Sequence, residues 1–324
     1  MKNKPIIIVL GEPYSVFSEL IFKIFKSNLI LDIKRPIILI GSEQLLKKQM
    51  KKLGYNFYIN KIHQNDIQNI VLSNKSLNLI NVNFYHHKIF DEITTRSNKY
   101  IDDCFIIALN LIKKDPQISL INGPISKKNF LKNKFLGITE YLAQKVNKKN
   151  SVAMLIYNKK LSVSPVTTHL PLKQVHKNLS KIKIINHVKL IADFYKKQFN
   201  KNPKIAITGL NPHCESNYKS SEEDKIIIPS IKKLNKSIYK VDGPFAADTI
   251  FMKKNSSKYD VIIGMYHDQV LTPIKTLFGF DAINITLGLP FIRISPDHGP
   301  NHTMLGKNLS DPKSLIEAIK FLNK

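Results

Sequence analysis

Cysteine is scarce in this chain of 324 residues, which contains only Cys104 and Cys214. Two cysteines offer neither a disulfide framework nor a paired-cysteine metal knuckle. Long apolar runs are also missing, because the longest, such as Ile6–Leu10 and Val261–Met265, have strand length, whereas a membrane span needs about 20 residues. The first residues, MKNKPIIIVLGEP, run into a strand and a turn without the pattern of a signal peptide. These absences predict a cytoplasmic protein with no membrane partner.

Arginine is rarer than the net charge suggests. Lysine and arginine total 50 against 24 acidic residues, a formal charge of +26, yet only Arg35, Arg96 and Arg293 are arginines. Specific recognition of nucleic acid favours the guanidinium fork, and the lysines are scattered rather than gathered in a stripe. We therefore expect no specific nucleic-acid partner, although nonspecific electrostatic association at low salt is expected. The 43% hydrophobic and 23% charged content is typical of a soluble globular protein.

Glycine-rich nucleotide motifs are absent as well. The 12 glycines form neither G-x-G-x-x-G nor G-x-x-x-x-G-K-[ST]. Gly11, Glu12 and Pro13 follow the first predicted strand but do not fit either motif. If a nucleotide binds, it binds in another way, and the cofactor-binding residues stay unassigned.

Short apolar segments alternate with amphipathic ones, which predicts an α/β fold with a mainly parallel sheet. The predicted strands are Pro5–Leu10, Pro36–Ile40, Ile118–Ile121, Val152–Tyr157, Leu161–Val166, Lys204–Thr208, Val261–Gly264, Ala282–Thr286 and Phe291–Ile294. The predicted helices are Ser18–Lys26, Glu43–Leu53, Asn98–Lys113, Lys181–Phe199, Glu222–Leu234 and Pro312–Leu322. The spacing of Ser220 and Glu223 resembles a capping box for the fifth of these helices.

Three histidines follow predicted strands. LSVSPVTTH ends at His169, KIAITGLNPH ends at His213, and DVIIGMYHD passes through His267. Ligands of open α/β sheets bind beyond the carboxyl ends of the strands, and neutral imidazole is a common ligand of divalent metals. The shared position predicts a metalloenzyme, and the alternative is three unrelated loop histidines.

The stretch Tyr266–Gly299 is unusually rich in polar residues between apolar strands, which is costly unless they serve a site. Lys275 and Arg293 are candidates to bind an anionic substrate, the arginine in bidentate fashion. The alternative for Arg293 is a structural ion pair with Asp297 or another acid.

Six ordered segments resemble one family: TTHLPL, GLNPH, EEDKIIIP, DGPFAADTIF, MYHDQ, and NITLGLPFIR followed by DHG. The family is 4-hydroxythreonine-4-phosphate dehydrogenase, a branch of the isocitrate and isopropylmalate dehydrogenase fold. The similarity runs from Gly11 through Gly299. It implies two α/β domains with a central cleft.

The resemblance also implies an activity and a site. The metal ligands would be His169, His213 and His267, binding zinc, magnesium or cobalt. The implied reaction oxidises the 3-hydroxyl of 4-phosphooxy-L-threonine with NAD (or NADP). Decarboxylation to 3-amino-1-hydroxyacetone 1-phosphate follows, in pyridoxal phosphate (vitamin B6) biosynthesis. The residues implied to bind the substrate are Thr139, Lys275, Asn284 and Arg293.

Two acids are candidates for orienting ligands or moving protons: Asp268, next to a predicted metal ligand, and Asp248 in AADTIF. Asp248 with Thr249 is equally suited to beginning a helix over Thr249–Lys253. Cys214, beside His213, is interpreted as a bystander, because a catalytic metal site needs open coordination positions.

Departures from the family pattern leave the substrate open. Ile138 stands where the family usually has a substrate-binding histidine, so one hydrogen-bonding group is lost. Bulky residues also replace small ones after Pro13 and after His213. The alternatives are a related dehydrogenase acting on another phosphorylated hydroxyacid, such as a four-carbon sugar acid phosphate, and a noncatalytic metal- or nucleic-acid-binding protein.

The expected domain organisation is discontinuous. Residues 1–120 and 265–324 are expected to form the cofactor-side domain, and residues 121–264 the domain with metal ligands and the dimer interface. The resemblance implies a homodimer in which His267 faces His169 and His213 of the partner subunit.

Overall fold

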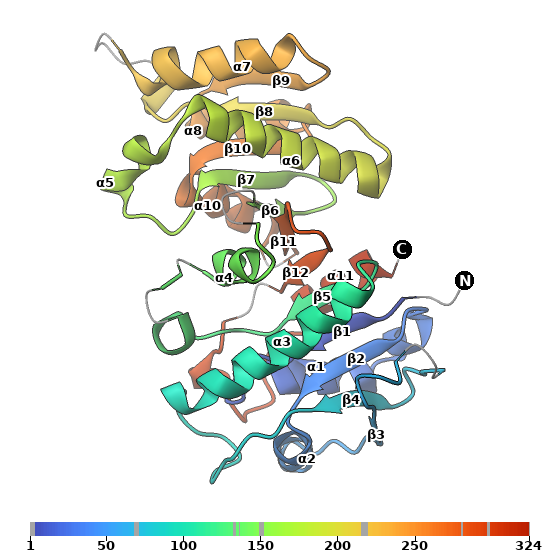
Figure 1. The fold of residues 1–324 in the computed structure, drawn as a ribbon. Coiled ribbons are helices and arrows are strands. Elements are labelled where there is room, and N and C mark those ends of the chain that lie inside the picture. The colour runs from blue at the N-terminus through green and yellow to red at the C-terminus, as the bar shows by residue number, and fades with distance from the viewer. Residues whose placement is uncertain are drawn as a thin grey trace. The chain divides into compact units, whose positions relative to one another are not determined.

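The computed structural model describes residues 4–67, 71–131, 134–135, 137–148, 152–214, 220–279, 281–296 and 299–323. The chain forms two compact units: unit 1 is Met1–Ile138 with Pro290–Lys324, and unit 2 is Thr139–Leu289. Each combines a β-sheet with helices (Figure 1), so the predicted α/β class with two α/β domains is confirmed. Within the described ranges, no helix has the length and apolar character needed to cross a membrane.

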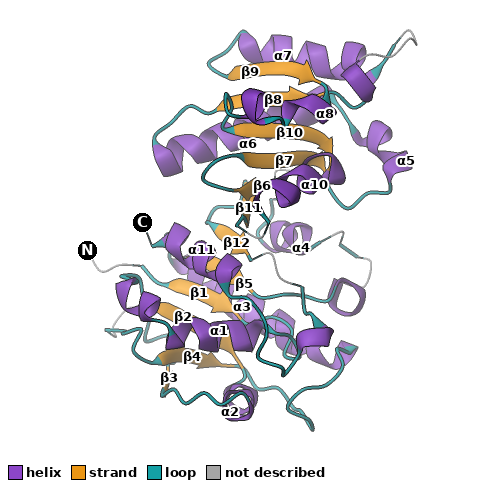
Figure 2. Cartoon of the chain, turned by 180° about the vertical axis from the view of Figure 1, so that it is seen from behind, coloured by secondary structure: helices purple, strands orange, loops and turns teal. Residues whose placement is uncertain are grey.

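Unit 1 is built on a parallel sheet with the strand order β3-β4-β2-β1-β5-β12. The strands are β1 (Ile6–Val9), β2 (Ile37–Gly41), β3 (Ile59–Lys61), β4 (Leu77–Asn81), β5 (Ser119–Asn122) and β12 (Arg293–Ser295). Strands β1 and β2 are buried along their whole length, as is typical of parallel strands covered on both faces. Figures 1 and 2 show α3 on one face of the sheet and α1 on the other.

The helices of unit 1 follow the apolar periodicity of the sequence. In α1, the residues Leu20, Ile21, Ile24 and Phe25 form a buried stripe. Its last turn is basic, which suits the negative end of the helix dipole. The helices are α1 (Phe17–Lys26), α2 (Glu43–Lys52), α3 (Asn98–Lys114) and α11 (Lys313–Leu322).

Unit 2 has a mixed sheet in the order β11-β6-β7-β10-β8-β9. Strand β6 pairs antiparallel with β11 and β7, whereas β7, β10, β8 and β9 are parallel. The strands are β6 (Ala153–Tyr157), β7 (Ser162–Thr167), β8 (Lys204–Thr208), β9 (Lys240–Phe245), β10 (Val261–Tyr266) and β11 (Ile283–Leu287). The parallel part directs several carboxyl strand ends to one edge.

Helices cover both faces of the unit 2 sheet, with α6 on one side and α10 on the other (Figures 1 and 2). Val270, Leu271 and Ile274 of α10 pack with Val163 of β7 and Ile262 of β10 in one buried cluster. The helices are α4 (Ile138–Lys145), α5 (Leu172–Val175), α6 (Lys181–Phe199), α7 (Ile228–Asn235), α8 (Ala247–Ile250), α9 (Lys253–Ser256) and α10 (His267–Phe278). Ile138, the first residue of α4, is assigned to unit 1.

Each strand and helix predicted from the sequence has a counterpart, but some elements were missed. These are β3, β4, β9, α4, α5, α9 and α10, of which α10 contains Pro273 and was interpreted only as a polar stretch. The predicted helix over Glu222–Leu234 is a π-helical turn, Glu223–Ile227, followed by α7. Its cap is Ser221 rather than Ser220, because Ser221 Oγ accepts from the backbone N–H of Asp224 at 3.2 Å. The helix expected over Thr249–Lys253 begins earlier, at Ala247.

The two units have boundaries different from the predicted ones at 120/121 and 264/265. The second predicted boundary lies inside β10, which continues directly into α10. Both elements pack on β7, so residues 265–289 belong with unit 2. Residues 121–138 belong with unit 1.

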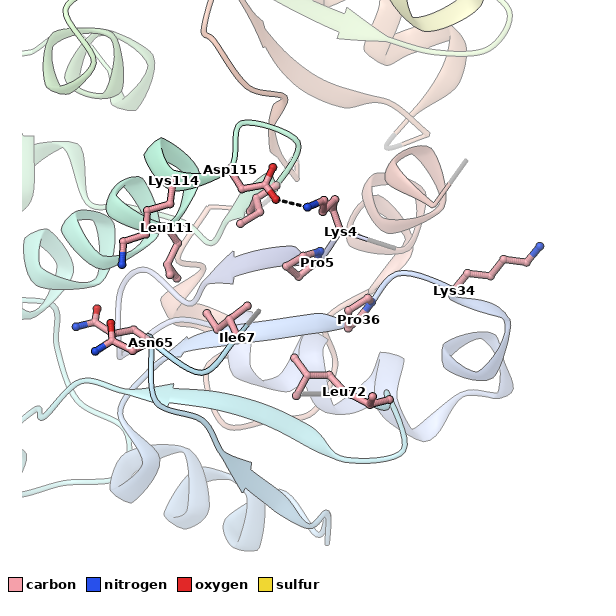
Figure 3. A pocket seen from close by; sticks show the side chains of 13 residues that line it. Lys4, Pro5, Lys34, Pro36, Asn65, Ile67, Leu72, Leu111, Lys114 and Asp115 are labelled. Atoms are coloured by element: carbon pink, nitrogen blue, oxygen red, sulfur yellow. Dashed lines mark ion pairs between the residues drawn. The ribbon is translucent and has the colours of Figure 1, made fainter. Parts of the chain in front are cut away.

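A cavity of about 650 Å³ lies at the amino ends of β1, β2 and β5 in unit 1 (Figure 3). Its wall includes Leu72 and Leu111, and an ion pair of 2.6 Å joins Lys4 Nζ to Asp115 Oδ2 beside it. None of the predicted site residues lines this cavity. Ligands of open α/β sheets bind at the opposite, carboxyl ends of the strands.

A buried histidine holds α6 against the sheet of unit 2. His187 Nε2 lies 2.6 Å from Ser164 Oγ of β7, and the side chain is almost fully buried. Burial lowers the pKa of His187 to about 4, and the nearby charge of Lys183 adds to the effect. The folded protein therefore favours the neutral imidazole.

Acid should destabilise the fold through His187. The unfolded state takes up a proton below about pH 6.5, whereas folded His187 resists it until about pH 4, so stability should fall between these values by ~3 kcal/mol. We expect His187→Gln to flatten this slope in urea unfolding measured from pH 7 to pH 4, with the exposed His63→Gln as control. Equal slopes for the two variants would contradict this assignment.

Candidate functional site

The carboxyl ends of β7, β10 and β8 bring the predicted metal ligands to one edge of unit 2. His267 follows β10 immediately, His169 lies two residues beyond β7, and His213 lies in a turn after β8. The rings of His169 and His267 have centroids 5.7 Å apart. Two imidazoles bound to one zinc with Zn–N of ~2.1 Å place their centroids roughly 5 to 5.5 Å apart, so these two rings need to approach only slightly.

His169 and His267 line a cavity of about 310 Å³, together with Thr167, Tyr266 and Asp268. His213 is not among the lining residues. In the described part of one chain, no three His, Cys, Asp or Glu side chains are grouped to hold a metal ion. Within the described residues of one chain, the structure therefore groups His169 with His267, and the role of His213 as a third ligand stays a prediction.

Asp268 fixes the orientation of the His267 ring. Its Oδ1 lies 2.6 Å from His267 Nδ1. An ionised carboxylate can only accept, so Nδ1 carries the proton and Nε2 keeps its lone pair. That tautomer is the one that a metal-binding imidazole needs. Asp268 itself is 79% exposed.

The backbone is strained at two of the three histidines. His169 has φ of 25° and His213 has φ of 58°, and Cys214 follows with φ of 58°. Residues with a Cβ rarely adopt this left-handed region, and such strain concentrates at functional sites.

Glu223 holds the loop that carries His213. Its Oε1 accepts from the backbone N–H groups of Leu210 (2.7 Å) and Asn211 (2.9 Å), and its Oε2 accepts from Asn211 Nδ2 (2.8 Å). Burial is the largest single influence and raises the pKa of Glu223, but the donated hydrogen bonds together outweigh it and the pKa is lowered. From the sequence, Glu223 was predicted only to cap a helix. It lies in EEDKIIIP, one of the segments that resemble the family, and this position could have indicated a role at the site.

Thr139 and Asn284, two predicted substrate-binding residues, lie around β11. Thr139 Oγ1 is 3.4 Å from Thr286 Oγ1, and Asn284 shares a face of β11 with Thr286 because side chains alternate along a strand. Asn284 Oδ1 is buried without a hydrogen-bond partner in the described part of the chain. A buried oxygen without a hydrogen bond costs free energy. A bound ligand that donates a hydrogen bond to this oxygen would remove that cost.

Lys275 and Asp248, the other two predicted site residues of unit 2, are exposed. Lys275 lies in the last turn of α10, and Asp248 in the first turn of α8. Ala246 precedes α8 and no side chain caps it. The helix-start interpretation of Asp248 with Thr249 is therefore wrong, because the helix begins before both residues.

Arg293 is fully buried in unit 1, on β12. Its Nε donates to Asn122 Oδ1 at 2.7 Å. Asp297, the named ion-pair candidate, lies outside the described residues. A guanidinium held at full burial by the end of β5 is a costly arrangement.

A buried acid that the sequence did not reveal lies beyond β1. Glu12 Oε2 accepts from Ser97 Oγ (2.9 Å) and Oε1 from the backbone N–H of Ser126 (3.1 Å). Burial raises its pKa, while the two hydrogen bonds oppose the shift. Gly11 beside it has φ of 75°, and a Cβ there would lie 2.5 Å from the carbonyl oxygen of Pro124. Glycine is therefore required where these loops meet.

Comparison with known proteins agrees with the fold. Residues 32–322 match the family model described as pyridoxal phosphate biosynthetic protein PdxA. A 4-hydroxythreonine-4-phosphate dehydrogenase of Sulfurihydrogenibium sp. (strain YO3AOP1) is 37% identical, covering 97% of this chain and 95% of the relative. A putative D-threonate 4-phosphate dehydrogenase of Oceanobacillus iheyensis is 30% identical, covering 98% and 97%.

A solved structure leads to the same class. The crystal structure of 4-hydroxythreonine-4-phosphate dehydrogenase from Klebsiella pneumoniae superimposes with a TM-score of 0.85 at 26% identity, covering 99% of this chain and 97% of that one. The α/β fold and these relatives define the protein as an enzyme of the dehydrogenase class. The chain belongs to the pyridoxal phosphate biosynthetic protein PdxA family, so the predicted family is confirmed.

Replacing Glu223 should loosen the loop after β8. Glu223→Gln puts an N–H₂ group near N–H donors and should cost about 1.5–3 kcal/mol of unfolding free energy at pH 7. Hydrogen exchange of the Leu210 and Asn211 amides should speed up in parallel. Because the folded pKa is lowered, the cost should shrink as the pH falls below about 4.

The neighbouring Glu222→Gln is the matched control, since Glu222 makes one bond, from Asn211 Nδ2 at 3.0 Å. An equal loss of unfolding free energy in the two variants would show that Glu223 does not hold the loop.

Proposed function

We propose that the protein oxidises the 3-hydroxyl of 4-phosphooxy-L-threonine with NAD (or NADP), followed by decarboxylation to 3-amino-1-hydroxyacetone 1-phosphate. The observation that carries the proposal is the pair His169 and His267 at the carboxyl strand ends of a chain in this family. In the reaction, the C3 hydride goes to the nicotinamide ring and the hydroxyl proton to a base. The β-keto acid then loses carbon dioxide and takes up a proton.

His169 and His267, which line the cavity, are donors that fit a divalent metal, and His213 is proposed as the third ligand. When bound, such an ion lowers the pKa of the substrate hydroxyl and stabilises the negative charge that develops on loss of carbon dioxide. Asp268 keeps His267 in the tautomer with a free Nε2. The third ligand is missing from the cavity of one chain, so His213 must approach through a loop movement or come from the partner subunit in a homodimer.

The substrate-binding roles rest on chemistry that each side chain can supply. The Thr139 hydroxyl and Asn284 amide can hydrogen-bond to polar substrate groups, and the Asn284 oxygen has a vacant acceptor position in the described chain. Lys275 and Arg293 are proposed to bind the phosphate and carboxylate charges. Asp248 is proposed to exchange protons with solvent, because it is exposed at the start of α8.

A second substrate has specific support. One relative is named a putative D-threonate 4-phosphate dehydrogenase, and Ile138 begins α4 where the family resemblance implies histidine. Replacing the amino group of the substrate by a hydroxyl would need no change in the oxidation chemistry. Substrate choice is therefore an outcome of the test below.

The activity is tested by following NADH absorbance with purified, metal-loaded protein. We expect 4-phosphooxy-L-threonine to be oxidised with release of carbon dioxide, and Asn284→Ala to lower kcat/KM by about 10-fold, as expected for loss of one buried hydrogen bond. Higher kcat/KM for D-threonate 4-phosphate would favour the second substrate. If neither compound supports reduction of NAD, both proposed substrates are ruled out.

The metal ligands are tested by His169→Ala, His213→Ala and His267→Ala, with the exposed His63→Ala as control. Each ligand variant should lose more than the 10–100-fold in metal affinity that is typical of a group supporting a ligand, and should lose activity while its thermal unfolding changes little. Full metal content in all three variants would rule out this assignment.

Mixing inactive variants then shows which chain supplies His213. If His267 works with His169 and His213 of the partner subunit, exchange of His169→Ala with His267→Ala subunits restores about a quarter of the wild-type activity. If His169 and His267 of one chain work with the partner's His213, the mixture of His169→Ala with His213→Ala recovers instead. Recovery in neither mixture, with exchange confirmed by mass spectrometry, means that one chain supplies all three ligands.

A further inference from the structure

A second, smaller cavity at the carboxyl ends of the unit 1 strands contains none of the residues discussed as metal or substrate ligands. Its volume is about 140 Å³, and its wall includes Tyr14 from the loop after β1 and Phe84, His86, Asp91, Arg96 and Ser97 from the segment between β4 and α3. An apolar cavity of ~150 Å³ is known to hold benzene. This cavity therefore has room for one planar ring.

The cavity adjoins the point where the strand order of unit 1 reverses. From β1 the chain moves to β2, β3 and β4 on one side of the sheet, and it returns to β5 on the other side. Ser97 links the cavity wall to this point, because its hydroxyl donates to Glu12, which in turn accepts from Ser126 after β5. In open α/β sheets, ligands bind beside such a reversal, at the carboxyl ends of the strands.

Aromatic rings form the walls. Tyr14 meets Phe84 edge-on, with centroids 5.8 Å apart, and Phe84 lies nearly parallel to His86, at 6.2 Å and an interplanar angle of 8°. Heteroaromatic rings stack on such side chains with a gain of about 1–3 kcal/mol each. The walls favour a flat aromatic ligand over a sugar or an isolated phosphate.

His86 adds a polar requirement. Its Nδ1 lies 3.1 Å from the carbonyl oxygen of Phe84, and a carbonyl only accepts, so Nδ1 carries the proton and Nε2 of the neutral ring is an acceptor. Nε2 is buried without a hydrogen-bond partner among the described residues, on a side chain that is 9% exposed. Such a group is satisfied by a ligand that donates an N–H.

Arg96 supplies charge at the rim. It is one of only three arginines in the chain, and it is exposed beside the cavity. Arg35 is occupied by backbone carbonyls of Lys4, Pro5 and Leu322, whereas the charge of Arg96 acts on Asp91, which lines the same cavity. A guanidinium next to a ring-sized cavity matches a phosphate joined to a heteroaromatic nucleoside.

We propose that this cavity binds one heteroaromatic ring of the nicotinamide dinucleotide, whose amino or carboxamide N–H donates to His86 Nε2 while Arg96 contacts the adjoining phosphate. The identity of the ligand rests on the proposed function; the location rests on the cavity. The adenine and the nicotinamide ends share the required chemistry, since each carries an NH₂ group on or next to a ring.

The test is calorimetric titration of the wild-type protein with NAD, NADP, AMP, ADP-ribose and nicotinamide mononucleotide. His86→Phe keeps a stacked ring but removes the acceptor, and Arg96→Gln removes the charge at an exposed position that should not disturb folding. Each should weaken dinucleotide binding about 10-fold or more. Lys99→Gln, which removes an equal charge from the nearby Lys99–Asp103 pair, should leave the affinity within about two-fold.

The smaller ligands identify the end of the cofactor. If Arg96→Gln weakens AMP and ADP-ribose, the cavity holds adenine; if it weakens nicotinamide mononucleotide alone, the cavity holds the nicotinamide ring. Unchanged dinucleotide affinity in Arg96→Gln and in folded His86→Phe, or no binding by the wild-type protein, would overturn the proposal. If the dinucleotide binds as expected but neither phosphorylated substrate is oxidised, the proposed function fails and the cavity assignment stands.

Discussion

Parallel pairing of β7, β10 and β8 is the constraint on which the arrangement of unit 2 depends. Hydrogen bonding fixes the register, and the common strand direction delivers three loops to one edge. The ring pair His169 and His267 follows from this register, because Tyr266 lies opposite Thr167 in the ladder. α10 then begins at His267 without an intervening loop, so the packing of α10 against β7 also determines where that imidazole lies.

The sequence predicted much of this arrangement because its signals are local. A continuous apolar run identifies a buried parallel strand. The strands β7, β8 and β10 end at Thr167, Thr208 and Tyr266, so the residues that follow lie at their carboxyl ends. The same reasoning located His169 and His267 beside one cavity, whereas His213 is not among the residues that line it. The loop that carries His213 depends on Glu223, whose carboxylate accepts hydrogen bonds from the loop backbone 12 to 13 residues earlier in the chain. Periodicity carries no information about such a bond.

Burial of polar groups was the main property that the sequence could not provide. Glu12 and Arg293 lie far apart in the chain, and each is enclosed in unit 1 by partners from distant segments, Ser97 and Ser126 for the acid and Asn122 for the base. Their surroundings arise only when the strands are paired. α10 was missed for a different reason: Pro273 lies inside it, and the helix is retained because Val270, Leu271 and Ile274 bury an apolar stripe against the sheet.

Unit 2 is inserted between two segments of unit 1, and this order has a consequence for synthesis on the ribosome. β12 pairs with β5, yet 170 residues separate Asn122 from Arg293. The first unit to begin emerging therefore cannot complete its sheet until the whole of the second has been translated. At about 5–20 residues per second, β5 waits on the order of ten seconds with one edge unpaired. The helix α3 is already synthesised by then, but it packs on β1 and β2 over a face of the sheet, so it leaves the backbone groups of that edge open.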